Sequence, residues 1–126
     1  MKAYLAIKYH PDHQNRSLIE GISHALAKSG IETVCVTRDI EQWGVYHFSP
    51  EELMQRSFAE IDASDLVLIE LSEKGVGLGI EAGYAYAKRI PIITIAQQGA
   101  DISTTLQGIS QKVYFYDTTK QLADFI

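Results

Sequence analysis

The stretch that most constrains this chain runs from Ser64 to Ala87 and reads SDLVLIELSEKGVGLGIEAGYAYA. It opens with an apolar run, Leu66 to Ile69, of the kind found in strands buried on both faces of a sheet. A polar, glycine-rich segment follows, and the stretch ends in a helical pattern that carries one carboxylate, Glu81, in its first turns. The pattern predicts a buried strand that passes into a helix through a loop able to approach a ligand.

Three glycines, Gly75, Gly77 and Gly79, alternate with apolar residues in this loop. Glycine lets a backbone come close to another group, and the N-terminus of the following helix offers free N–H groups to an anion or a sugar hydroxyl. The spacing matches neither the dinucleotide fingerprint GxGxxG nor a Walker loop. Two interpretations of the spacing stay open: a ligand-binding loop beside Glu81, or a tight turn next to a merely solvated glutamate.

Strand-like and helix-like patterns alternate along the rest of the chain. Strands are expected at Ala3–Lys8, Glu32–Thr37, Leu66–Ile69, Ile90–Ala96 and Val113–Tyr116. Helices are expected from Leu18 to Gly30, from a Ser49-Pro50-Glu51-Glu52 capping sequence onward, around Glu81, at Ser103–Gln107 and at Thr118–Ile126, with an irregular loop at Arg38–Ser49. This alternation predicts right-handed βαβ units and a parallel sheet covered on both sides.

The expected fold is therefore an α/β three-layer sandwich with a five-stranded parallel sheet in the flavodoxin-like order 2-1-3-4-5. In that order ligands bind beyond the carboxyl ends of strands one and three, at the topological switch point. The loops there are His10–Arg16 and Ser72–Glu81, so the topology by itself brings two polar loops together over one pocket.

The segment Gly75–Ala87, preceded by an apolar strand with Asp65 at its start, resembles the signature of the nucleoside 2-deoxyribosyltransferase family. That family includes the 2'-deoxynucleoside 5'-phosphate N-hydrolases, and the resemblance is dense over residues 57–95. It implies that Glu81 is the catalytic nucleophile and that an N-glycosidic bond is cleaved or exchanged. A carboxylate below the anomeric carbon suits that chemistry, because it can attack as the base leaves and form a glycosyl-enzyme ester.

The resemblance also implies a set of substrate-binding positions. These are Tyr9, His10, Asp12, Asn15 and Arg16 in the first loop, Ser57, Gly75, Gly77 and Gly79 around the nucleophile, and Ser103, which resembles a serine that a neighbouring subunit supplies. Lys8, His10 and Arg16 are candidates to meet a 5'-phosphate, although a polar surface loop with Asn15 as a helix cap is an equal interpretation.

Two of these positions depart from the family pattern. Ser57 stands where the family usually carries an aspartate, and Gly75 stands where transferases carry an aspartate and nucleotide hydrolases a serine. Serine cannot act as a carboxylate base near neutral pH, and glycine offers only its backbone N–H. Asp12 and Asp62 are candidates to supply the missing carboxylate from another position.

Composition bounds the remaining possibilities. The 126 residues are expected to form one domain, residues 1–126, and eleven Lys plus Arg against sixteen Asp plus Glu give a net charge of −5. No basic stripe is dense enough for polymeric DNA or RNA, whereas a single nucleotide is not excluded. The chain shows no signal-peptide or membrane-span pattern and one unpaired cysteine, Cys35, which together favour a cytoplasmic protein.

No cofactor or metal is expected, since His10 and His13 lack further ligands at metal-binding spacing. The sequence thus predicts an enzyme that cleaves or transfers the N-glycosidic bond of (deoxy)nucleosides or their 5'-monophosphates, as a homodimer or larger homo-oligomer. Hydrolysis and base exchange both stay open. The alternatives are a non-catalytic nucleotide-binding module that has lost part of the catalytic set and, more remotely, a flavin-binding or signalling domain.

Trp43, Tyr46 and Phe48 are expected either to stack on a base or to pad a subunit contact.

Overall fold

The computed structural model describes all residues from Met1 to Ile126. Its five strands form one parallel sheet in the order β2-β1-β3-β4-β5, which confirms the predicted topology. The strands are β1 (Lys2–Ile7), β2 (Glu32–Val34), β3 (Leu66–Glu70), β4 (Ile92–Gln97) and β5 (Lys112–Tyr116). The helices are α1 (Arg16–Ala27), α2 (Pro50–Asp62), α3 (Val76–Ala87), α4 (Thr104–Ile109) and α5 (Leu122–Phe125).

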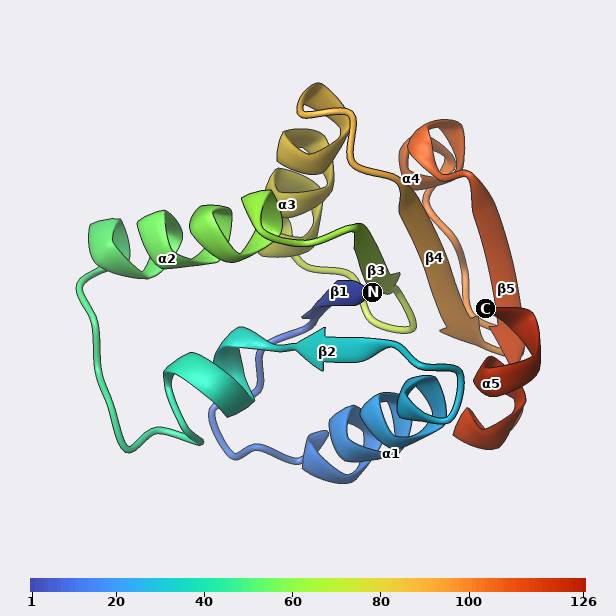
Figure 1. The fold of residues 1–126 in the computed structure, drawn as a ribbon, viewed down its shortest axis with the longest axis horizontal. Coiled ribbons are helices and arrows are strands. Elements are labelled where there is room, and N and C mark those ends of the chain that lie inside the picture. Colours follow the sequence, from blue (N-terminus) through green and yellow to red (C-terminus); the bar gives the residue numbers. More distant parts are fainter.

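The helices cover both faces of the sheet, so the molecule has three layers. α1 and α5 pack on one face, and α2, α3 and α4 pack on the other (Figure 1). Alternation along β3 serves both faces: Leu66 and Leu68 belong to the first core, whereas Val67 and Ile69 belong to the second. This period of two, with apolar residues at every position, explains why the strand reads as a continuous apolar run.

The predicted start of α2 is confirmed in atomic detail. The Ser49 side chain accepts a hydrogen bond from the Glu52 amide at 3.2 Å, and Pro50 occupies the first turn, where its missing N–H leaves nothing unsatisfied. Phe58 of α2 stacks on Tyr84 of α3 with ring centroids 4.2 Å apart. The two helices that flank the site are thus fixed to each other.

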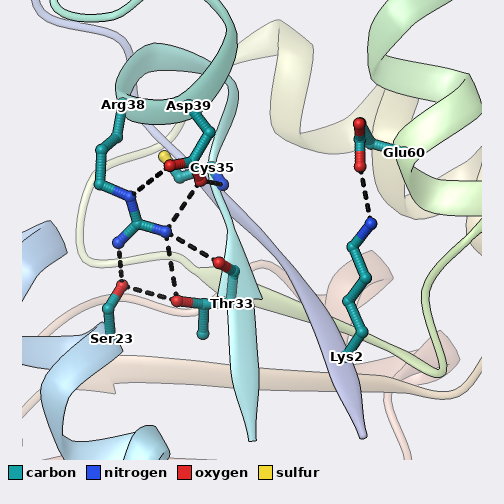
Figure 2. Close-up of polar contacts among 7 residues, drawn as sticks. All are labelled: Lys2, Ser23, Thr33, Cys35, Arg38, Asp39 and Glu60. Atoms are coloured by element: carbon teal, nitrogen blue, oxygen red, sulfur yellow. Dashed lines mark hydrogen bonds and ion pairs between the residues drawn. The ribbon is translucent and has the colours of Figure 1, made fainter.

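The segment after β2 differs from the expectation. The strand ends at Val34 rather than Thr37, and the chain then forms a π-helical turn at Val36–Ile40 instead of an irregular loop. An ion pair causes the change, because the Asp39 carboxylate accepts from the Cys35 amide at 2.8 Å and pairs with Arg38 at 2.8 Å (Figure 2). Local side-chain bonds of this kind compete with the strand ladder.

The C-terminal segment also differs from the single helix expected at Thr118–Ile126. It forms a 3-10 turn at Thr119–Gln121 and then the short α5, because Thr118 and Gln121 make a capping box that tightens the first turn. No helix of the structure combines the length and the apolar character that crossing a membrane requires.

Candidate active site

The carboxyl ends of β1 and β3 lie side by side, since Ile7 is paired with Glu70 in the parallel register. Above these ends lie two adjoining cavities of about 200 and 240 Å³. Four residues line both cavities: Ile7, Tyr9, Gly77 and Glu81. Glu81 therefore stands at the junction of the two, at the switch point that the topology predicted.

The Glu81 carboxylate is largely buried, and no charged group or full set of hydrogen bonds offsets the cost of that burial. Its Oε2 is inaccessible to solvent and has no hydrogen-bond partner, while its Oε1 lies 3.9 Å from the point where a Cβ on Gly77 would stand. Burial raises the pKa of Glu81 to about 7, and the nearby Tyr4 hydroxyl opposes this rise only in part. Buried polar atoms are rarely left without a partner, so this unpaired oxygen marks Glu81 as a candidate functional group.

Tyr4 is a site residue that sequence reasoning missed. It lies on β1, its side chain is 2% exposed, and its hydroxyl stands beside the Glu81 carboxylate and the Ser57 hydroxyl. Burial and the charge of Glu81 raise the pKa of Tyr4 far above its ordinary value, so it stays a neutral donor. In the sequence Tyr4 is one aromatic residue of a buried strand, and the only available signal was that a buried tyrosine hydroxyl needs a polar partner.

Ser57 lines the cavity of about 200 Å³ on α2, as predicted, but its hydroxyl already donates to the Leu53 carbonyl at 2.9 Å. The two aspartates considered as substitute carboxylates lie elsewhere. Asp62 accepts from the Tyr84 hydroxyl at 2.8 Å, and Asp12 accepts from the Gln14 amide at 3.1 Å. Neither lines either cavity, whereas Glu41, which sequence reasoning did not single out, does.

The cavity of about 240 Å³ opens on a positive region. Gly75 is the N-cap residue of α3, without a side chain to cap the helix, and the Lys8 side chain crosses directly over it. A Cβ at Gly75 would lie 3.1 Å from Lys8 Cδ and 3.6 Å from its Nζ. Lys8 Nζ has no ion-pair or hydrogen-bond partner among the contacts of the structure, so a free ammonium and a helix N-terminus face the same cavity.

The other predicted residues of the first loop hold the loop together. His10 bonds Glu73 Oε1 at 3.0 Å and accepts from Gln14 at 2.7 Å. Asn15 does not cap α1 with its side chain but donates to the Lys8 carbonyl at 2.8 Å. Arg16 donates to Glu20 at 3.1 Å and lies 4.6 Å over the Trp43 ring.

The predicted positions thus fall into two groups. Tyr9, Ser57, Gly75, Gly77 and Glu81 line the two cavities, whereas His10, Asp12, Asn15, Arg16, Gly79 and Ser103 do not. Gly79 lies on the exposed side of α3, and Ser103 precedes α4 with its hydroxyl 2.7 Å from that of Thr105. No cluster of three His, Cys, Asp or Glu side chains is arranged to hold a metal ion.

A second buried carboxylate, Glu70, fixes the loop that leads to α3. It accepts from the Ser72 amide at 2.6 Å, from the Ser72 hydroxyl at 2.8 Å and from the Tyr116 hydroxyl. The Ser72 hydroxyl oxygen accepts in turn from the Gln97 amide at 2.8 Å. The loop below Glu81 is therefore tied to both β4 and β5.

Comparison with known proteins places this geometry in a known fold. No protein-family model matches the chain, and no curated protein sequence does. Solved structures match over nearly the whole chain. A 2-deoxyribosyltransferase from Bacillus psychrosaccharolyticus superposes with a TM-score of 0.78 at 15% identity, covering 100% of this chain and 93% of that one.

Two further structures agree. The CMP N-glycosidase BcmB from Clostridium botulinum has a TM-score of 0.68 at 22% identity and covers 99% of this chain and 96% of its own. A conserved protein from Enterococcus faecalis has a TM-score of 0.71 at 17% identity, with 98% and 95% covered. The chain therefore has the complete α/β fold of these proteins, as its sequence resemblance implied.

Proposed function

We propose that this protein cleaves or exchanges the N-glycosidic bond of a nucleoside or nucleoside 5'-monophosphate, with Glu81 as the nucleophile. The observation that carries the proposal is the buried, unpartnered Glu81 carboxylate oxygen at the junction of two cavities. The shared fold of a 2-deoxyribosyltransferase and a CMP N-glycosidase supports the reaction class.

The chemistry follows from the burial of Glu81. As the bond between C1' and the base nitrogen breaks, its electron pair leaves with the base and positive charge develops on the sugar. An ionised carboxylate in a water-poor site stabilises that charge more than it would in water. One carboxylate oxygen then bonds to C1', and water or a second base resolves the ester. The neutral Tyr4 hydroxyl stands beside this carboxylate, where it can donate a proton to a hydrogen bond.

The two cavities suit the two ends of a nucleotide. The Lys8 ammonium and the N-terminus of α3 face the cavity that would take a 5'-phosphate. The other cavity, with Tyr9 at its edge and the apolar Val36 and Met54 in its wall, would take the base. Glu81 lies between them, where the sugar of such a ligand would stand.

A non-catalytic nucleotide-binding module is the second candidate. The observation in its favour is that Ser57 and Gly75 replace polar partners of the resembled family, and that the Ser57 hydroxyl is engaged with a backbone carbonyl. This candidate keeps the same cavities and ligand class but assigns no turnover to Glu81.

The decisive experiment incubates the purified protein with nucleosides, deoxynucleosides and their 5'-monophosphates, with and without a free acceptor base, and follows released base by chromatography. We expect base release, and Glu81→Gln should abolish it while the variant stays folded. Glu51→Gln, the same chemical change at an exposed position of α2, is the control and should keep full activity.

The arms of this experiment separate the alternatives. Release without acceptor identifies a hydrolase, and product only with acceptor identifies a transferase. A fully active Glu81→Gln variant would contradict the role of Glu81. Ligands that raise the melting temperature without any turnover would establish the binding module instead.

A further inference from the structure

Glu41 is the only carboxylate besides Glu81 in the wall of the cavity of about 200 Å³, which would take the base. Its backbone is fixed independently of its side chain. The Glu41 amide donates to the Val36 carbonyl at 2.9 Å, and its own carbonyl accepts from the amides of Gly44 at 3.1 Å and Tyr46 at 3.0 Å. Exchanging the side chain therefore leaves the turn its hydrogen bonds.

The turn that carries Glu41 is clamped to the body of the protein. The Arg38 guanidinium donates to the Thr33 carbonyl at 2.8 Å and to the Ser23 hydroxyl of α1, while Asp39 holds the Cys35 amide (Figure 2). The residues that follow, Gln42 and Trp43, have positive φ angles of 48° and 58°. Residues other than glycine rarely adopt this backbone conformation, and it persists where the surrounding structure imposes it.

The Glu41 side chain itself is partly buried and has no hydrogen bond or ion pair among the contacts of the structure. Burial raises its pKa, and the charges of His13 and His47 act in the opposite direction. The titratable groups that share its cavity are Tyr4, Tyr9, Cys35 and Glu81. An ionised carboxylate only accepts hydrogen bonds, so Glu41 presents an acceptor to whatever fills the cavity.

We propose that Glu41 selects the base of the substrate by accepting a hydrogen bond from an exocyclic amino group. This inference rests on the proposed function and names its substrate class: nucleosides or nucleotides of cytosine or adenine, in preference to those of uracil or hypoxanthine. The members of each pair differ where one carries an amino group and the other a carbonyl oxygen. A carbonyl there would face the carboxylate as a second acceptor with no proton between them.

The placement of the other charged groups is consistent with this assignment. Lys8 stands in the cavity on the far side of Glu81 and suits the phosphate end of a nucleotide. With the sugar above Glu81, the base lies in the cavity that Glu41 and Thr37 line. Apolar side chains, among them Val36, Leu53 and Met54, form much of the remaining wall, so the carboxylate sets the polarity of that surface.

The test measures kcat/KM for matched pairs: CMP against UMP, AMP against IMP, and the corresponding deoxynucleotides. We expect the amino member to be favoured by roughly tenfold or more in the wild type. Glu41→Gln should bring the ratio close to one, since an amide can both accept and donate. Glu51→Gln is the matched control and should leave the ratio unchanged.

A binding measurement keeps the inference testable apart from catalysis. The same pairs are titrated calorimetrically into Glu81→Gln protein, which the proposed function predicts to leave them intact, with and without Glu41→Gln. If the wild-type protein turns over none of these ligands, but CMP or AMP binds more tightly than its partner and Glu41→Gln removes that difference, the proposed activity fails and the role of Glu41 stands. Equal use and equal binding of both members, or a preference that survives Glu41→Gln, would overturn the inference.

Discussion

The position proposed to make Glu81 functional also makes its ionised form unfavourable for the stability of the fold. Its pKa in the folded protein is about 7, against an ordinary value of 4.5. Between these two pH values the unfolded chain loses the proton more readily than the folded one, so the free energy of unfolding falls as pH rises through this window. Below it the carboxyl group is neutral in both states, and above it the loss is complete.

Glu81→Gln should therefore stabilise the protein in a pH-dependent way. At about 1.4 kcal/mol per pKa unit, the gain approaches about 3 kcal/mol near pH 8 and vanishes near pH 4. Urea denaturation of both proteins at the two pH values measures it. Glu51→Gln, an exposed change in the first turn of α2, should not produce a gain in stability that grows with pH. A constant difference for Glu81→Gln across the range would exclude the titration as its cause.

Of the three residues central to the site, Glu81 could be predicted from the sequence, whereas Tyr4 and Glu41 could not. Glu81 stands out because a single carboxylate interrupts an apolar, glycine-rich helix start. Tyr4 is indistinguishable from a core residue, since the adjacent strand residues Ala3 and Leu5 to Ile7 are apolar. Glu41 falls in a segment without strand or helix periodicity, and only the Arg38 and Asp39 bonds that form the turn bring it to the cavity.

Among the elements, the loop after β1 lies against the start of α3, and this contact places the positive charge of Lys8 at the site. Gly75 has an extended φ of −161°, which any residue adopts. Glycine serves here because a Cβ would press on Lys8 Cδ at 3.1 Å. The absent side chain lets the lysine lie over the helix N-terminus.

Lys8→Gln should accordingly weaken the use of phosphorylated substrates selectively. We expect KM for a nucleoside 5'-monophosphate to rise roughly tenfold or more, the magnitude of a lost charge-assisted hydrogen bond, with KM for the nucleoside unchanged. Steady-state kinetics on both substrates tests this, with Lys28→Gln on the exposed end of α1 as control. An equal loss on both substrates would show that Lys8 does not meet the phosphate.

The element order was predictable because each strand is an apolar run and each helix has a recognisable start or stripe. The sequence also located the β3–α3 loop correctly. It did not predict the end of β2, because the side chains of Arg38 and Asp39 there compete with strand pairing through contacts from α1 and β2. Contacts between distant segments decide such boundaries.

For the whole molecule, the outer side of α3 is unusually apolar. Val76 is 83% exposed, Ile80 48% and Tyr86 59%, and such exposed apolar surface is typical of contact regions. This is consistent with the predicted homodimer or larger assembly, in which Ser103 would complete a neighbour's site.

Light scattering should then give the mass of a dimer or a larger oligomer. Ile80→Lys, which places a charge on this apolar surface, should shift the protein toward the monomer and lower its activity. Gln55→Lys at an exposed position of α2 should change neither. A wild-type protein that is strictly monomeric and active would contradict this arrangement.

The buried Glu70 anchor has a consequence for how the protein can change over generations. Its bonds to Ser72 and Tyr116 shape the β3–α3 loop without using any side chain that lines the two cavities around Glu81. Substitutions at lining positions outside the core, such as the exposed Tyr9 and the half-buried Glu41, therefore leave these loop bonds intact. A lineage that keeps Glu70 can acquire a different substrate preference by single substitutions at such positions while the loop beneath Glu81 keeps its shape.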